Sequence, residues 1–152
     1  MINRVDSIRT YIDNIFDHIE DVGQRRAAYI HSYGVSHCCA LLATKRGLNV
    51  ELATNIGLLH DVYSYKTGFA TWHSHNGAEM VRVAFKYSIS NLFSNIEQKI
   101  IKSAIFHHSN IIRRAHDEKI GCYIRIPNDY VYDGWKINFK TDEIKTVEYS
   151  EA

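Results

Sequence analysis

The sequence is poor in proline, in paired cysteines and in long apolar runs, and each scarcity excludes a class of protein. Proline occurs once in 152 residues, at Pro127, which favours long helices because proline breaks a helix interior. The three cysteines are Cys38, Cys39 and Cys122. No CxxC pair is present, so neither a zinc knuckle nor a disulfide framework is expected, and a reducing compartment fits better. We interpret Cys38 and Cys39 as small core residues of a helix.

The sequence also lacks a strong charge of either sign. Lys and Arg number 18 and Asp and Glu number 17, for a formal net charge of +1. This balance does not indicate a nucleic-acid-binding protein, and the short pairs Arg25-Arg26 and Arg113-Arg114 do not form a basic stripe. No run of about 18 apolar residues occurs, and the charged N-terminal segment does not resemble a signal peptide. We therefore expect a soluble, cytoplasmic protein with no membrane partner.

Apolar periodicity predicts five helices in the first part of the chain. Gly47 is suited to a C-terminal cap, Asn49 to an N-cap, and Ser94 with Glu97 forms a capping-box pattern. The third helix is almost wholly apolar, so we expect it to be central and buried. The expected helices cover roughly residues 4–20, 25–46, 51–61, 74–87 and 96–108, and a loop is expected over 62–72.

After about residue 118 the pattern changes from helical to β-prone. Residues 122–140 are rich in Tyr, Ile, Val and Phe, and Asp133-Gly134 between two such runs is typical of a type I′ hairpin. We therefore expect an all-α domain over residues 1–118 and a β-hairpin extension or irregular tail over 119–152. The edge of such a tail would permit pairing with a second chain, and hence a homodimer.

Nine histidines are present, and one stands beside a carboxylate at the end of the most apolar predicted helix. Burying His60 and Asp61 side by side is costly unless something binds them. A divalent metal satisfies an imidazole and a carboxylate together. Other histidines fall at predicted helix ends or turns, from which they could meet in one cleft. They are His31, His73, His75, His107 and His108. The alternative is that each is a separate hydrogen-bonded or surface histidine.

Taken in order, these motifs resemble the HD superfamily of metal-dependent phosphohydrolases. The matching stretches are YIHSYGVSHCCALLATKRGLNVELATNIGLLHD, HSHNGAEMVR and IIKSAIFHHSN, which together span roughly residues 25–110. The resemblance implies an all-helical bundle of five or more helices, in agreement with the helices expected from periodicity. The pattern is most similar to the bimetallic branch of the superfamily, which includes hydrolases of dinucleoside polyphosphates.

The resemblance also implies a site. One or two divalent ions, such as Mn or Fe, would be the cofactor, and the small substrate would be a nucleotide or a related phosphate ester. The implied metal ligands are His31, His60, Asp61, His73 and His108. His75 and His107 are the rivals of the last two histidines. Asp61 would be catalytic as the carboxylate that bridges two metals. Lys66 is the second catalytic candidate and would hold the phosphate, with Arg82 as a weaker candidate.

Two positions depart from the family pattern. Many members have lysine three residues after the aspartate of the pair, where this chain has Ser64, so Lys66 would serve instead. The last ligand of the family is an aspartate in an apolar Ala-Asp context, which this sequence lacks, and Asp129 and Asp117 are the nearest carboxylates. Two main hypotheses stay open: a metal-dependent phosphohydrolase, and a degenerate HD module that binds a nucleotide or partner without catalysis. A helical domain with incidental histidines is the third.

Overall fold

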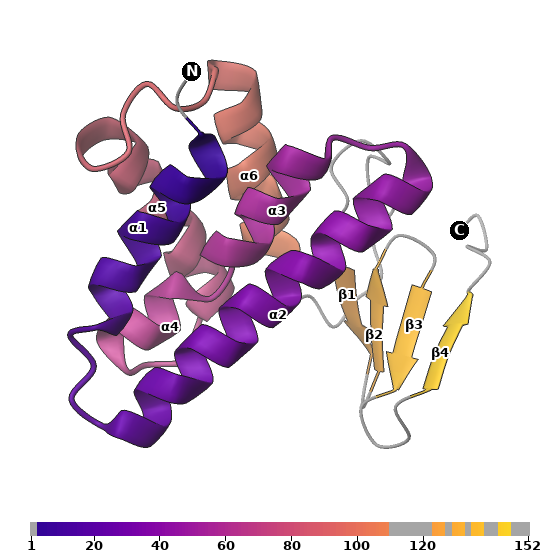
Figure 1. The fold of residues 1–152 in the computed structure, drawn as a ribbon, viewed down its shortest axis with the longest axis horizontal. Coiled ribbons are helices and arrows are strands. Elements are labelled where there is room, and N and C mark those ends of the chain that lie inside the picture. Colours follow the sequence, from indigo (N-terminus) through magenta and orange to yellow (C-terminus); the bar gives the residue numbers. More distant parts are fainter. Residues whose placement is uncertain (1–2, 110–122, 127–128, 133–134, 139–142, 147–152) are drawn as a thin grey trace.

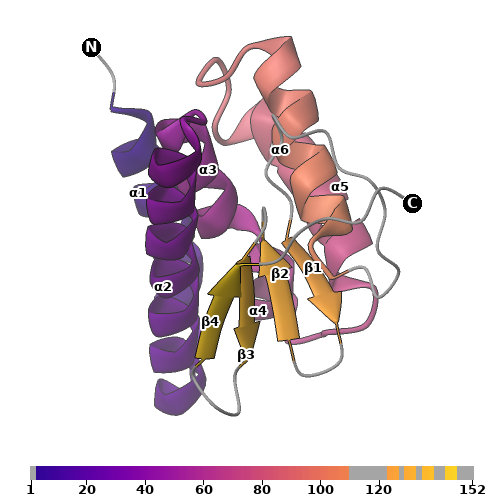
Figure 2. The same ribbon diagram turned by 90° about the vertical axis from the view of Figure 1, so that its right-hand side faces the viewer.

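A computed structural model describes residues 3–109 and the backbone of four strands, and it shows a helical bundle followed by one antiparallel sheet (Figures 1 and 2). The predicted bundle of five or more helices is confirmed. The six described helices are α1 (Arg4–Phe16), α2 (Val22–Arg46), α3 (Val50–Leu59), α4 (Val62–Thr67), α5 (His73–Tyr87) and α6 (Asn95–His107). The strands are β1 (Tyr123–Ile126), β2 (Asp129–Tyr132), β3 (Trp135–Asn138) and β4 (Glu143–Thr146).

The helix ends lie where the expected capping residues stand. Gly47 ends α2 with a φ of 66°, a left-handed conformation that glycine adopts without steric cost. Asn49 opens α3 by accepting a hydrogen bond from the backbone N–H of Leu52. Ser94 and Glu97 form both hydrogen bonds of the capping box at the start of α6. These local signals therefore fix the junctions between α2 and α3 and before α6.

Two of the expected boundaries are wrong. The first helix ends at Phe16 and not near residue 20. Ile19 packs on the core from the turn beyond the helix, so the apolar periodicity of the sequence continues past the end of the helix. Residues 62–67 form the short helix α4 instead of a loop. Gly68, which was expected as a turn within a loop, is the left-handed C-cap of that helix, with a φ of 76°. The glycine therefore marks the end of α4.

One expected core position is also wrong. Cys39 is buried, but Cys38 is exposed, because neighbouring residues point about 100° apart around a helix and only one of them can face α3. Ile96 is exposed as well. The buried side of α6 is formed by Ile101, Ala104 and Ile105.

The main core is an apolar cluster to which all six helices contribute, and a smaller cluster of Cys39, Ala43 and Ala53 joins α2 to α3. The helix α3 is central, since eight of its ten residues are buried, as its sequence predicts. Phe16 of α1 is fully buried and meets the rings of Tyr29 and Tyr65 edge to face, an arrangement that aromatic quadrupoles favour. The core thus joins α1, α2 and α4 directly beneath the end of α3.

The C-terminal strands pair in the order β1-β2-β3-β4, each antiparallel to the next. Tyr132 pairs with Trp135, so β2 and β3 are joined by the two residues at which the hairpin was predicted. The expected β-prone extension is therefore present as strands. Asp117 and Cys122 lie outside the described residues.

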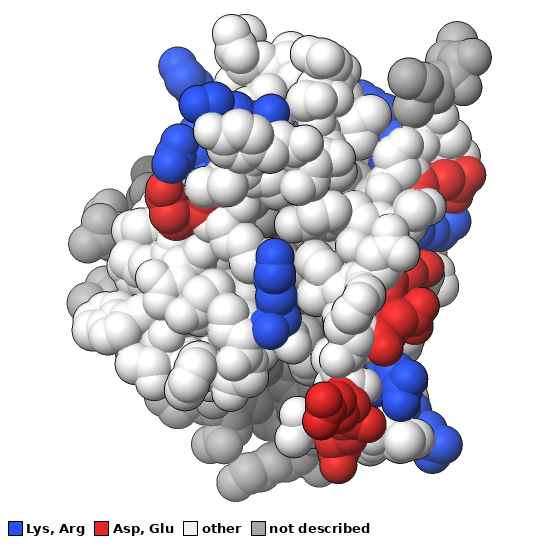
Figure 3. Space-filling view, turned by 90° about the vertical axis from the view of Figure 1, so that its left-hand side faces the viewer, with Lys and Arg blue, Asp and Glu red and all other residues white. Residues whose placement is uncertain are grey.

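Two surface properties bear on the class of protein. Among the described residues, no helix is both long enough and apolar enough to cross a membrane. On the face drawn in Figure 3, the Lys and Arg side chains of the described residues lie in small separate groups, several of them beside acidic side chains. This distribution matches the balanced net charge of the sequence.

The helices α2 and α3 approach each other closely at Gly57. A Cβ atom at this position would lie 2.6 Å from the Cα atom and 2.9 Å from the backbone nitrogen of Ser36. Backbone atoms cannot rotate away as a side chain can. Because α2 carries His31 and α3 leads into His60, this contact also sets the distance between two of the predicted ligands.

We expect Gly57→Ala to lower the free energy of unfolding by about 3 kcal/mol, because the added methyl group overpacks a backbone contact. Denaturant unfolding measures the change. The matched control is Gly34→Ala on the exposed side of α2, where an added Cβ meets nothing within 4 Å. That variant should gain about 0.5–1 kcal/mol from its higher helix propensity. Equal stabilities of the two variants would contradict the close crossing.

Candidate metal centre

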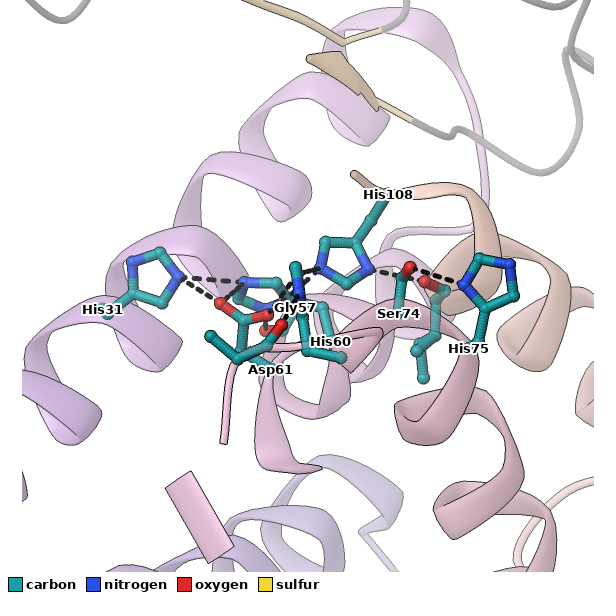
Figure 4. A network of polar contacts seen from close by, with 10 residues as sticks. His31, Gly57, His60, Asp61, Ser74, His75 and His108 are labelled. Carbon is teal, nitrogen blue, oxygen red and sulfur yellow. Dashed lines mark hydrogen bonds and ion pairs between the residues drawn. The ribbon is translucent and has the colours of Figure 1, made fainter. Parts of the chain in front are cut away.

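Five side chains from four separate parts of the bundle meet at one point (Figure 4). His31 lies on α2, and His60 is the last residue associated with α3. Asp61 follows as the N-cap of α4. His73 is the first residue of α5, and His108 is the C-cap of α6. The buried, apolar α3 therefore delivers the His60-Asp61 pair into the interior, where the other three histidines reach it.

The five residues form two triads that share one carboxylate. In the first triad, the Oδ2 atom of Asp61 lies 3.0 Å from His31 Nε2 and 3.2 Å from His60 Nε2, and the two nitrogens are 3.0 Å apart. In the second triad, Oδ1 lies 3.1 Å from His108 Nε2 and 3.6 Å from His73 Nε2, and these nitrogens are also 3.0 Å apart. Ligands bound at about 2.0–2.1 Å from one metal ion lie about 3 Å from each other. Each triad therefore has the spacing of ligands around one ion.

The tautomers of three histidines fit a metal site. The Nδ1 atoms of His60, His73 and His108 each face a backbone carbonyl three residues earlier in the chain. A carbonyl can only accept, so Nδ1 carries the hydrogen and Nε2 of the neutral ring presents a lone pair. Two lone pairs thus converge beside a carboxylate oxygen in the second triad. Such an arrangement repels itself unless a cation lies among the three atoms, and a divalent metal is the cation that this donor set suits.

The charge of Asp61 is strongly favoured in this setting. Burial raises the pKa of its carboxyl group, but the surrounding imidazoles of His60, His108 and His31 outweigh that effect and hold the pKa well below its usual range. Asp61 is therefore a carboxylate at neutral pH. The helices α3 and α6 both end at this cluster, and the partial negative charge of their last carbonyls favours a cation there as well.

The cluster opens to solvent along one edge. The side chains of His60 and His108 are only 2% and 6% exposed, whereas those of His31 and His73 are 44% and 25% exposed. A ligand therefore reaches the triads from the side of His31 and His73, while His60 and His108 lie on the buried side of the cluster.

Tyr65 stands beside this opening and was missed in the sequence. Its ring centroid lies 6.2 Å from that of His31, and it follows Asp61 by one turn of α4. Burial, and secondly the charge of Asp61, raise the pKa of Tyr65 to about 12, so the phenol stays protonated. The spacing of four residues from Asp61 would have indicated this position, but only if the segment had been predicted as a helix.

The rival histidines lie outside both triads. The ring of His75 packs on Phe106, with centroids 4.2 Å apart, and its Nδ1 atom faces the hydroxyl of Ser74. The ring of His107 also packs on Phe106, with centroids 5.0 Å apart. Between each pair of rivals, the structure brings His73 and His108 to the carboxylate.

The predicted phosphate contacts have different surroundings. Lys66 is exposed in the last turn of α4, within two turns of Asp61. Arg82 is held by a double hydrogen bond from its guanidinium to Glu79 on the exposed side of α5. It lies nine residues beyond His73, which is about 13 Å along the helix axis. The structure therefore does not bring Arg82 to the cluster. Asp129 begins β2, and Asp117 is outside the described residues.

Comparison with known proteins gives one family match. The sequence model of the HD domain matches residues 28–144, which is more than half of the chain and includes all five residues of the two triads. No curated protein and no solved structure gives a match.

We expect Asp61→Ala to abolish metal binding at both triads, because among the described residues this carboxylate is the one ligand that the two share. The side chain makes no capping hydrogen bond to α4, so its loss does not remove a helix cap. The measurement is elemental analysis of protein loaded with Mn and then desalted. His31→Ala should keep the ion of the second triad, and the control His75→Ala should bind as the unmodified chain does. Undiminished metal in Asp61→Ala would contradict the shared site.

Proposed function

Because the chain belongs to the HD domain family, we propose that it is a metal-dependent phosphohydrolase that acts on a nucleotide or a related phosphate ester. The observation that carries this proposal is the pair of histidine triads that share Asp61. Divalent ions of the Mn or Fe type, when bound there, supply a hydroxide nucleophile at neutral pH and offset the charge of a phosphoryl group.

The protein's own groups make the site attractive to a phosphate. An imidazole binds a metal as an uncharged ligand, so Asp61 contributes the single negative charge among the five residues of the two triads. The open edge at His31 and His73 gives a phosphate access, and buried His60 and His108 keep the inner side closed. A phosphate would therefore bind at the open edge, next to the bound cations, while the buried side of the site stays closed to water.

Lys66 is the proposed phosphate contact of the chain. It is exposed in the last turn of α4, close in sequence to Ser64, which stands where many family members have a lysine. Its ammonium group forms no hydrogen bond or ion pair with another residue in the part of the chain that the structure describes. A cation in this position is available to a substrate, whereas Arg82 is already paired with Glu79.

A second candidate function is ligand binding without turnover. Within the described residues, each triad offers three ligand atoms, and no further carboxylate joins either group. The sequence also lacks the Ala-Asp pair of the family. Asp129 or Asp117 is the proposed replacement in an active enzyme. In a degenerate module, neither would complete the site, and a nucleotide would bind without being hydrolysed.

We expect the Mn-loaded protein to release phosphate from nucleotide substrates, and His60→Ala to lower kcat/KM by more than about a hundredfold. Loss of an outer partner of a metal ligand typically costs 10–100-fold, so loss of a buried ligand costs more. The control is His18→Ala, since His18 lies outside both triads and its Nδ1 atom donates to the carbonyl of Asn14. Nucleotide binding without any phosphate release would favour the degenerate module.

We expect Lys66→Ala to raise KM about tenfold, because one charge-assisted hydrogen bond contributes roughly 1.5–3 kcal/mol. Steady-state kinetics of the Mn-loaded protein measures this change. Arg82→Ala is the matched control: it also removes one exposed cation, but one that is paired with Glu79, and its KM should not change. A larger effect of the Arg82 variant would contradict the assignment of the phosphate contact.

A further inference from the structure

A small group of aromatic rings, Trp72, His75 and Phe106, flanks the second triad, and we name it the aromatic patch. The rings of Trp72 and His75 meet edge to face with centroids 5.4 Å apart, and those of His75 and Phe106 with centroids 4.2 Å apart. Figure 4 places His75 on the side of His108, at the end of the cluster away from His31. The patch therefore continues the row of site residues beyond the metal centre.

Trp72 has two properties that a packing residue would not need. It is 69% exposed, so most of its indole lies in solvent. It also has a φ of 54°, in the left-handed region, which is strained for a bulky side chain. The other left-handed positions among the described residues are held by Gly47, Gly68 and Asn91, residue types that adopt this conformation at little cost. Strained residues of this kind concentrate at ligand sites, and Trp72 directly precedes His73.

We propose that the aromatic patch holds the base of a nucleotide whose phosphate lies at the metal centre, with Trp72 as the principal stacking residue. This inference rests on the proposed function, because that function places the phosphate at the triads. A purine or pyrimidine presents a flat face, and an exposed indole stacks on any such face without a matching set of hydrogen bonds. The substrate class is therefore a nucleotide, bound with little selection among bases.

A second copy of the chain is the other occupant to consider, and the size of the patch disfavours it. A stable protein interface covers about 800 Å² on each partner. Aromatic side chains bury about 150–250 Å² each when fully covered, and the three rings of the patch already cover part of one another. A single heteroaromatic base matches this area better.

Fluorescence tests the proposal, because the chain has only two tryptophans, Trp72 and Trp135. In Trp135→Phe, the emission comes from Trp72 alone. We expect adenosine 5′-monophosphate to quench this emission in the Mn-loaded protein, and ribose 5-phosphate, which lacks a base, to leave it unchanged. Both ligands carry a phosphate for the metal centre, so the difference between them reports on the base alone.

Calorimetric titration of a Trp72 variant gives the second measurement. Trp72→Asn removes the ring, and asparagine tolerates the left-handed conformation at this position. It should weaken binding of adenosine 5′-monophosphate about tenfold and reduce its advantage over ribose 5-phosphate. The matched control is Tyr87→Asn, which removes an aromatic side chain of similar exposure, 71%, from the far end of α5 and should bind as the unmodified chain does.

Three results would overturn the proposal. Equal affinity for both ligands without quenching would place the base elsewhere and leave the phosphohydrolase proposal intact. No binding of either ligand to the Mn-loaded protein would contradict both proposals. A change of Trp72→Asn from dimer to monomer in size-exclusion chromatography, with unchanged nucleotide affinity, would identify the patch as an interface between copies of the chain.

Discussion

The structure depends on the convergence of imidazole lone pairs on one carboxylate. His60, His73 and His108 have their Nδ1–H groups tied to backbone carbonyls, so their Nε2 atoms are fixed as electron donors facing Asp61. Without a cation these donors repel one another, and with one they become ligands. The fold thus holds a site that is favourable only when it is filled, and the bound ion should stabilise the folded chain by mass action.

The bundle brings these donors together through helix ends and one close crossing. The helices α3 and α6 end at the cluster and α5 begins there, so three ligands are held by the ends of helices whose bodies pack in the core. His31 comes from the middle of α2, and its distance from His60 is set where Gly57 meets the backbone of Ser36. The central, buried α3 therefore serves both stability and the site.

Local chemistry in the sequence predicts much of this arrangement. Capping residues locate the helix ends, and the His60-Asp61 pair at the end of an apolar helix indicates a buried polar site. Choosing His73 over His75 required the family motif, because the apolar periodicity does not show which way a side chain in the first turn of a helix points. Tyr65 was missed because a six-residue helix is too short to show a period. The conformation of Trp72 is set by the turn between α4 and α5, which no local pattern in the sequence reveals.

We propose that the carboxylate of Asp61 serves two cations at once. Anomalous X-ray diffraction from crystals grown with Mn tests it most directly, because it locates each metal ion independently of the protein atoms. We expect two anomalous peaks, one between Asp61 and the pair His31 and His60, and one between Asp61 and the pair His73 and His108. A single peak, or peaks that do not touch Asp61, would contradict it.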